Sequence, residues 1–245
     1  MDVPAIYFKE VCLDFEGVSL LDNFCCTIPT GKCSCLLGPS GCGKSTILGL
    51  ISGRDLPYTG EIVFPSAVQA VNQISWMSQD DLLLPWLNVL DNVVLGAKLR
   101  NEADTIWVNK AERLLGQAGL ADVVSNYPNQ LSGGMRQRVA LLRTLVEDRP
   151  VLLMDEPFSA LDALTRIKLQ DLAVRMTRGK TVLLVTHDPM EALRISDRII
   201  VLGGSPVRVE AVVDMESPAP RDLQQPEVST KYARLLKLLL GEGEV

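Results

Sequence analysis

A glycine-rich segment between two apolar runs constrains the fold of this chain more than any other feature. Residues 38–46 read GPSGCGKST and fit the phosphate-loop pattern G-x-x-x-x-G-K-[ST]. The apolar run 33–37 predicts a buried strand before the segment, and residues 47–51 predict a helix after it, ended by Gly53. The glycines let backbone N–H groups turn toward one anion, and the helix N-terminus adds its partial positive charge. The segment therefore predicts a site for nucleotide phosphates.

Two side chains of this segment have distinct expected roles. We expect Lys44 to reach the β- and γ-phosphates, and the Ser45 hydroxyl to bind Mg²⁺. The nucleotide-binding residues predicted from the segment are Gly38, Pro39, Ser40, Gly41, Cys42, Gly43, Lys44, Ser45 and Thr46.

Composition narrows the class of protein. The 245 residues are 47% hydrophobic, which is enough for one large α/β domain or two small ones. A net charge of −6 without a basic cluster argues against nucleic acid as a partner. Residues 1–10 lack the apolar core of a signal peptide, and no apolar run approaches the roughly 20 residues that span a bilayer. We therefore expect a soluble protein that reaches a membrane only through a partner.

The six cysteines do not have the spacing of a zinc site. Cys25 and Cys26 are adjacent, Cys33 and Cys35 alternate along the predicted strand, and no histidine lies nearby. We therefore expect the cysteines to be small apolar residues of the core.

The order of predicted elements indicates an α/β fold. Three predicted strands near the phosphate loop form a small antiparallel layer, a long middle stretch is helical, and strands and helices alternate after Pro150. This alternation favours a mainly parallel sheet with helices on both faces. Residues from 205 onward have looser patterning and end in a short apolar helix. The expected strands are 6–8, 19–28, 60–64, 151–154, 181–185 and 198–202, with an apolar run at 72–78; the expected helices are 107–118, 132–146, 163–178, 189–195 and 232–240.

Two carboxylates follow the apolar strand that begins at residue 151. In phosphate-loop ATPases, a strand beside the loop ends in an aspartate that holds Mg²⁺, and Asp155 has that place. Glu156 comes next and would face the γ-phosphate, where a carboxylate can act as general base on the attacking water. The pair predicts a metal ligand followed by a catalytic base.

Two more polar residues follow predicted strands. His187, the only histidine, comes after the strand 181–185, at the end where ligands of a parallel sheet gather. Gln79 follows the apolar run 72–78, and its side-chain carbonyl suits the attacking water or Mg²⁺. Both are therefore candidate catalytic residues, and Gln79 is also a candidate metal ligand.

A second anion-binding helix terminus is predicted at Ser132, Gly133 and Gly134. One nucleotide cannot be bound by the phosphate loop and also by a helix at the far end of the same domain. The simplest solution is a dimer in which each subunit's Ser-Gly-Gly helix closes over the γ-phosphate of the other.

The ordered set of motifs resembles an ABC-transporter ATPase subunit over nearly the whole chain, residues 6–202. It consists of the phosphate loop, Gln79, residues 131–135, residues 153–156, residues 159–162 and His187. The resemblance implies ATP and Mg²⁺ as cofactors. It also implies that Ser132 and Gly134 reach the partner's ATP, that Asp162 links the two sites and that Phe15 stacks on adenine. Phe15 could equally be a core residue, and Met135 replaces the more common glutamine, whose hydrogen bonds a thioether cannot make.

The resemblance also implies the domain organisation. Residues 1–205 would form a single ABC ATPase domain, with a helical subdomain at about 88–147 inserted in a RecA-like core. Residues 206–245 would form a C-terminal extension that ends in a short helix.

More narrowly, three segments resemble the nitrate, sulfonate, taurine and thiamine-pyrimidine-precursor importers: 83–93, 131–138, and the tail from 218 to 222 with the helix after it. That group implies a peripheral protein on the cytoplasmic face of the membrane. A separate membrane permease would dock on residues 80–92, where Leu82, Leu84, Trp86, Leu87 and Val89 supply apolar side chains. An extracytoplasmic binding protein would deliver the solute, a sulfonate, nitrate or a thiamine pyrimidine precursor.

Other classes of protein remain as alternatives. A soluble ABC ATPase of DNA repair or translation shares the site chemistry but usually carries two cassettes or basic insertions. An exporter ATPase with a separate membrane subunit also fits. A GTPase or a small kinase fits least, because residues 109–112 lack the aspartate of a guanine-reading motif and residues 132–134 would have no use.

Overall fold

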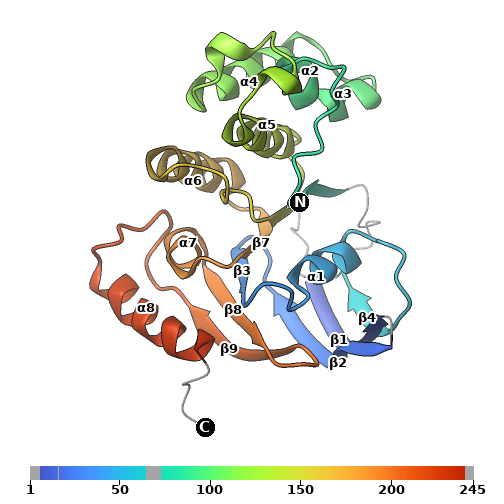
Figure 1. Cartoon of the computed structure of the whole chain (residues 1–245), viewed down its shortest axis with the longest axis vertical. Coiled ribbons are helices and arrows are strands. Elements are labelled where there is room, and N and C mark those ends of the chain that lie inside the picture. Colours follow the sequence, from blue (N-terminus) through green and yellow to red (C-terminus); the bar gives the residue numbers. More distant parts are fainter. Residues whose placement is uncertain (1–5, 16, 65–72, 241–245) are drawn as a thin grey trace. The chain divides into compact units, whose positions relative to one another are not determined.

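The computed structural model describes residues 6–15, 17–64 and 73–240 (Figure 1). They divide into two compact units. The first unit contains the residues up to 74, residues 150–155 and those from 178 onward, and the second contains residues 75–149 and 156–177. The domain boundaries expected from the sequence follow another criterion, the family resemblance, and stay a prediction.

A mainly parallel sheet forms the centre of the first unit. Its strand order there is β6-β7-β3-β8-β9, in which the first four strands run parallel and β9 is antiparallel. Strands β6 and β7 are buried along their whole length, which explains their continuous apolar sequence. The predicted parallel sheet is therefore confirmed. The strands are β3 (Cys33–Leu37), β6 (Val151–Asp155), β7 (Thr181–Thr186), β8 (Arg198–Gly203) and β9 (Arg208–Asp214).

The predicted antiparallel layer is also present in the first unit. It consists of β1 (Ile6–Phe15), β2 (Val18–Ile28) and β4 (Tyr58–Val63), in the order β2-β1-β4. Strand β1 is longer than the predicted 6–8. The polar residues Lys9 and Glu10, which interrupt the apolar pattern, lie at an irregularity in the pairing of β1 with both neighbours. The layer shares one hydrophobic core with the parallel sheet and with helix α1 (Lys44–Ile51). In this core Phe8 and Phe24 pack edge to face, with ring centroids 5.6 Å apart.

The second unit is mostly helical, as the sequence predicts for this stretch. Helix α5 (Gly133–Val146) packs against α2 (Val89–Val93), α4 (Thr105–Gln117) and α6 (Ala163–Thr177). In α4, the buried side chains Ala111, Leu114 and Leu115 follow the predicted helical spacing. The other elements are β5 (Ile74–Met77), which lies within the predicted apolar run 72–78, α3 (Leu95–Leu99), and the short 3₁₀ helices η2 (Ala121–Val123) and η3 (Pro128–Gln130). Asn72 lies outside the described residues.

The C-terminal part is more ordered than the sequence indicates. Strand β9 was not expected, since its exposed and half-buried residues and the prolines around it resemble a loop. Helix α8 (Pro226–Leu239) starts six residues before the predicted 232–240. It packs against α7 (Pro189–Ile195), β8 and β9, as Figure 1 shows beside β9. Among the described helices, none has a stretch long and apolar enough to span a bilayer.

Only some of the cysteines are core residues. Cys35 is fully buried, whereas Cys25 is exposed, so the expectation is wrong for Cys25. Burial raises the pKa of the Cys33 thiol to about 12 and the pKa of the Cys35 thiol well above its usual value. These two thiols therefore stay neutral, as apolar positions require.

Glu227 fixes the start of α8 to the segment before it. Its carboxylate accepts hydrogen bonds from the backbone N–H groups of Glu216 (2.8 Å) and Ser217 (3.2 Å). Lys231, one turn further along α8, donates to the same carboxylate at 2.7 Å. The hydrogen bonds from the Glu216 amide, Lys231 and Ser217 lower the pKa of Glu227 from 4.5 to about 2.

We predict that Glu227→Gln destabilises the protein at neutral pH and that the difference shrinks in acid. A carboxylate whose pKa is depressed by folding stabilises the folded state above its unfolded pKa of 4.5. This contribution is lost progressively as the pH falls through 4.5 toward 2. Urea unfolding of both proteins across this pH range measures the effect. The exposed Glu112→Gln on α4 is the control, and a difference that is constant with pH would contradict the prediction.

Candidate nucleotide site

The carboxyl ends of three parallel strands bring the first-unit site residues to one edge of the sheet. Strand β3 ends at Leu37, which lies opposite Thr186 of β7. Asp155, at the end of β6, lies opposite Val185. The phosphate loop after Leu37, the Asp155 carboxylate and His187 therefore leave the sheet side by side. Asp155 is buried, with 4% of its surface exposed.

The glycines of the phosphate loop are required by the backbone. A Cβ on Gly38 would lie 2.7 Å from the Leu202 carbonyl oxygen, so a side chain does not fit there. Gly41 and Gly43 have φ values of +80° and +95°, which L-residues with side chains rarely adopt. Gly43 is also the N-cap of α1, and it has no side chain to cap the first amides of the helix. Those amides are donors suited to phosphate oxygens.

Lys44 lies in the first turn of α1 and is buried. Its ammonium donates hydrogen bonds to the carbonyl oxygens of Gly38 at 2.9 Å and Pro39 at 2.7 Å. These bonds fold the side chain back along the loop and place a positive charge inside its curve. The residues therefore fit a nucleoside triphosphate, whose β- and γ-phosphates need a cation at this point.

The donors for Mg²⁺ also fit. Ser45 is exposed beside Lys44, and Asp155 supplies a carboxylate at the same sheet edge. Mg²⁺ bound to phosphates needs only one or two protein oxygens and keeps several waters. The Ser45 hydroxyl and the Asp155 carboxylate could supply oxygens of that kind.

Phe15 and His187 are both exposed. Phe15 ends β1 with 56% of its surface exposed, so the alternative that it is a core residue is wrong. His187 follows Thr186, whose hydroxyl accepts a hydrogen bond from the Asp188 N–H at 3.1 Å. The Asp188 carboxylate in turn caps α7, with bonds from Met190 N at 2.9 Å and Glu191 N at 3.4 Å.

The remaining predicted residues lie in the second unit, where α5 opens with Ser132, Gly133 and Gly134. The Ser132 hydroxyl caps α5 by accepting a hydrogen bond from Met135 N at 3.3 Å. A Cβ on Gly134 would lie 3.1 Å from the Ala160 carbonyl oxygen, so packing alone favours glycine there. A Cβ on Gly133 would meet nothing closer than 3.9 Å. The open space at Gly133 suits the close approach of a ligand.

Glu156 follows β6 in an unusual backbone conformation with a φ of 46°. Gln137 on α5, 6% exposed, holds the loop that starts there. Its amide donates to the Glu156 carbonyl and the Ser159 hydroxyl, both at 3.0 Å, and accepts from Ala160 N at 2.8 Å. The structure thus joins the Ser-Gly-Gly helix to the Glu156 loop. Sequence analysis missed Gln137, since nothing in its neighbourhood marks a buried amide.

Asp162 and Gln79 complete the set. The Asp162 carboxylate accepts a hydrogen bond from Thr165 N at 3.1 Å, just before α6, and this bond lowers its pKa. Gln79 is exposed two residues after β5. The predicted residues thus fall into two sets: the phosphate loop, Asp155, His187 and Phe15 in the first unit, and Gln79, residues 132–134, Glu156 and Asp162 in the second.

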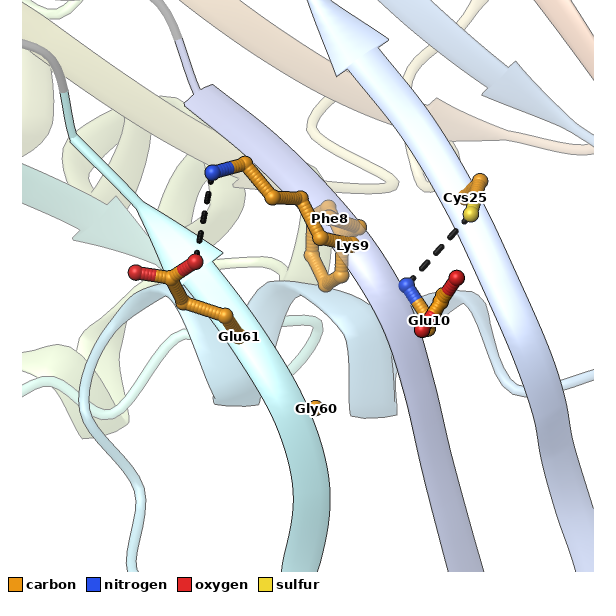
Figure 2. Close-up of a pocket in the computed structure, with 6 residues that line it drawn as sticks. All are labelled: Phe8, Lys9, Glu10, Cys25, Gly60 and Glu61. Carbon is orange, nitrogen blue, oxygen red and sulfur yellow. Dashed lines mark hydrogen bonds and ion pairs between the residues drawn. The ribbon is translucent and has the colours of Figure 1, made fainter.

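A pocket on the antiparallel layer is lined by none of the predicted site residues. Figure 2 shows its lining of Phe8, Lys9, Glu10, Cys25, Gly60 and Glu61. Lys9 and Glu61 form an ion pair of 3.2 Å across it, and Glu10 N donates to the Cys25 sulfur. A Cβ on Gly60 would lie 2.3 Å from the Glu10 carbonyl oxygen, so this glycine serves the packing of the strands.

Comparison with known proteins identifies the family of this chain. The family described as ABC transporter matches residues 21–159. An ABC transporter ATP-binding protein of Haemophilus influenzae is 42% identical over 97% of this chain and 99% of its own length. An aliphatic sulfonates import ATP-binding protein of Xanthomonas axonopodis is 46% identical over 83% of each chain. A similar protein of Pseudomonas aeruginosa is 41% identical over 97% of this chain and 85% of its own.

Solved structures agree as well. The dimeric structure of an ATP-binding cassette in a post-hydrolysis state, bound to ADP and Pi, is 31% identical with a TM-score of 0.76. The match covers 86% of this chain and 99% of that one. The predicted fold, a P-loop NTPase of the ABC ATPase type, is confirmed. The chain belongs to the ABC transporter family, as one of its ATP-binding and ATP-hydrolysing subunits.

Proposed function

We propose that this chain is the ATPase of an importer, and that two copies close around two ATP molecules to drive a separate membrane permease. The observation that carries the proposal is the shared edge of β3, β7 and β6. There the phosphate loop with its inward Lys44, the Asp155 carboxylate and His187 leave the sheet together. This arrangement supports phosphoryl transfer from ATP to water, in which positioning and charge supply most of the catalysis.

Each site residue has a proposed role in hydrolysis. Lys44 and the amides of α1 hold the β- and γ-phosphates, and Ser45 and Asp155 hold Mg²⁺, with Gln79 as a further oxygen donor. The bound Mg²⁺ would neutralise charge on the phosphates. Glu156 takes the proton of the attacking water, and His187 and Gln79 contact the γ-phosphate side of the site. Phe15, exposed at the end of β1, stacks on adenine.

The Ser-Gly-Gly end of α5 supports the proposed dimer. Its open space at Gly133 and its helix N-terminus suit a phosphate supplied by the second copy. Asp162 and the Glu156 loop are attached to the same helix through Gln137 and Ala160. Closure over the partner's ATP would therefore act on the chain's own catalytic loop, which supports the proposed link between the two sites.

The permease would dock on residues 80–92, where Leu82 and Trp86 expose 63% and 70% of their surface. Fully buried Asn92 holds the loop behind them, accepting from Leu84 N and donating to the carbonyls of Leu84, Leu87 and Asn88. Arg143 of α5 donates to the carbonyls of Asp81 and Leu82. The other expected docking residues are less exposed: Leu84 and Leu87 are half-buried, and Val89 belongs to the core.

The solute is proposed from the relatives. The aliphatic sulfonates import proteins that match this chain support a small organic anion such as a sulfonate. Nitrate and a thiamine pyrimidine precursor are the alternatives within the group that the sequence resembles. An extracytoplasmic binding protein would deliver the solute to the permease, and this chain would lie peripherally on the cytoplasmic face of the membrane.

We predict that Glu156→Gln keeps ATP binding and stops turnover. Loss of a general base costs about 10²–10⁴-fold in rate, while the phosphate contacts remain. Steady-state ATPase activity and equilibrium binding of Mg-ATP measure the two effects. Lys44→Ala is the opposite case, because it loses tight ATP binding as well, and Glu112→Gln is the control for an unrelated carboxylate. Turnover at the normal rate by Glu156→Gln would show that another group is the base.

The shared site predicts that a charge at residue 132 acts on the partner's ATP. Ser132→Asp and Ser132→Asn both keep the cap on α5, but only aspartate repels a phosphate. In dimers purified with two tags, one chain carries Lys44→Ala, so only the wild-type loop binds ATP. Ser132→Asp on the Lys44→Ala chain should remove the remaining ATP binding, and Ser132→Asn there should not. The same aspartate on the other chain should have little effect, and the reverse pattern would contradict a shared site.

Docking predicts that Trp86→Ala weakens binding of the permease and leaves the basal ATPase unchanged. Truncation of a central aromatic anchor costs about 2 kcal/mol, which is roughly thirty-fold in affinity. Titration of detergent-solubilised permease with each variant measures it. Leu99→Ala is the matched control, since Leu99 is 76% exposed on α3 and lies outside residues 80–92. Equal losses for the two variants would exclude a docking site at Trp86.

A further inference from the structure

Arg221 is a fully buried cation that none of the proposed roles uses. It lies between β9 and α8, with 1% of its surface exposed. Its Nη1 donates to the carbonyl oxygens of Leu193 at 2.9 Å and Ser196 at 2.7 Å. Its backbone N–H donates to the Arg194 carbonyl at 2.9 Å. One residue thus satisfies three carbonyls at the carboxyl end of α7.

The opposite end of α7 adjoins the candidate nucleotide site. His187 leaves β7 beside the phosphate loop, and Asp188 caps α7 directly after it. Helix α7 has only seven residues, so it is about 10 Å long and too short to be stable alone. Its position therefore depends on the packing of its buried residues Ala192, Leu193 and Ile195 and on the groups that bind its two ends.

The segment that holds Arg221 is itself anchored on α8. Arg221 Nε donates to the Ser217 hydroxyl at 3.1 Å, and Nη2 donates to the Ser217 carbonyl. Ser217 N and the Ser217 hydroxyl donate to Glu227 on α8. A continuous set of hydrogen bonds thus runs from α8 through Ser217 and Arg221 to the carboxyl end of α7.

A buried arginine at a helix carboxyl end stabilises that end specifically. The last carbonyls of a helix lack intrahelical donors and carry partial negative charge. A guanidinium supplies both the missing donors and a compensating positive charge. Burial lowers the pKa of Arg221, and the nearby carboxylates of Asp197 and Glu227 oppose this shift. Removal of the guanidinium would leave buried carbonyls unpaired, and α7 would fray toward its first turn.

We propose that Arg221 is a positioning residue for His187, which it holds in place through α7. The inference rests on the proposed role of His187 at the γ-phosphate. Through Arg221, the C-terminal segment would contribute to ATP hydrolysis without contacting the nucleotide.

The unique histidine makes a direct test possible. The chain contains one histidine, so the imidazole signals in the NMR spectrum of the tag-free full chain all belong to His187. In Arg221→Met we expect these signals to shift or broaden. The kcat for ATP should fall about tenfold to a hundredfold, the cost of a small misplacement. The KM for ATP should stay within about twofold, since the phosphate loop is untouched.

A matched control separates this effect from general destabilisation. Arg198 also makes two hydrogen bonds, to Asp214 at 2.6 and 3.0 Å, but it does not contact α7 through them. Arg198→Met should leave the imidazole signals and kcat unchanged. If Arg221→Met does not fold, Arg221→Lys serves instead, because lysine keeps the charge but cannot reproduce the fork of donors.

A double-mutant cycle tests whether Arg221 acts through His187. We expect Arg221→Met to cause no further loss of kcat in a His187→Ala background. An undiminished loss there, or an unchanged imidazole spectrum in folded Arg221→Met or Arg221→Lys, would overturn the inference. Normal ATP hydrolysis by His187→Ala would instead refute the proposed role of His187, and the spectra would still decide whether Arg221 positions it.

Discussion

The in-register pairing of β6, β7 and β3 is the constraint on which the candidate site depends. Because the three strands are parallel and buried, their carboxyl ends must lie at one edge. Opposed pairs at that edge fix where the phosphate loop, Asp155 and His187 begin. A slip of one residue in any strand would turn its side chains to the other face of the sheet. The apolar content of the strands therefore positions the polar residues that follow them.

Features encoded within a few residues could be predicted from the sequence. The bounds of β3 and α7 match their predictions, because an apolar run, a capping aspartate or a proline marks each of them locally. The phosphate loop could be predicted equally well, because its glycines are required locally by positive φ angles, as at Gly41 and Gly43. Elements and residues that depend on a distant partner were harder to predict.

Strand β9, Gln137 and Arg221 are of that second kind. Only Val213 of β9 is buried, so the alternation of Val209, Ala211 and Val213 is a weak signal, and the strand forms because β8 offers an unpaired edge. Gln137 and Arg221 look like ordinary surface residues of their segments. Each becomes recognisable only when the structure shows it buried among backbone groups from another part of the chain. Sequence patterns carry no signal for such contacts, because the partners lie many residues away.

Arg221 and Asn92 share one physical role. Short segments such as α7 and the loop 81–88 cannot hold a conformation by themselves, although α7 buries Leu193 and Ile195 and the loop buries Leu83. Each also depends on a buried polar side chain that donates to its backbone carbonyls: Arg221 for α7 and Asn92 for the loop. An unpaired buried carbonyl costs about 1–3 kcal/mol, so each of these side chains secures its segment strongly. Polar residues that bind no ligand can therefore decide where the ligand-binding residues stand.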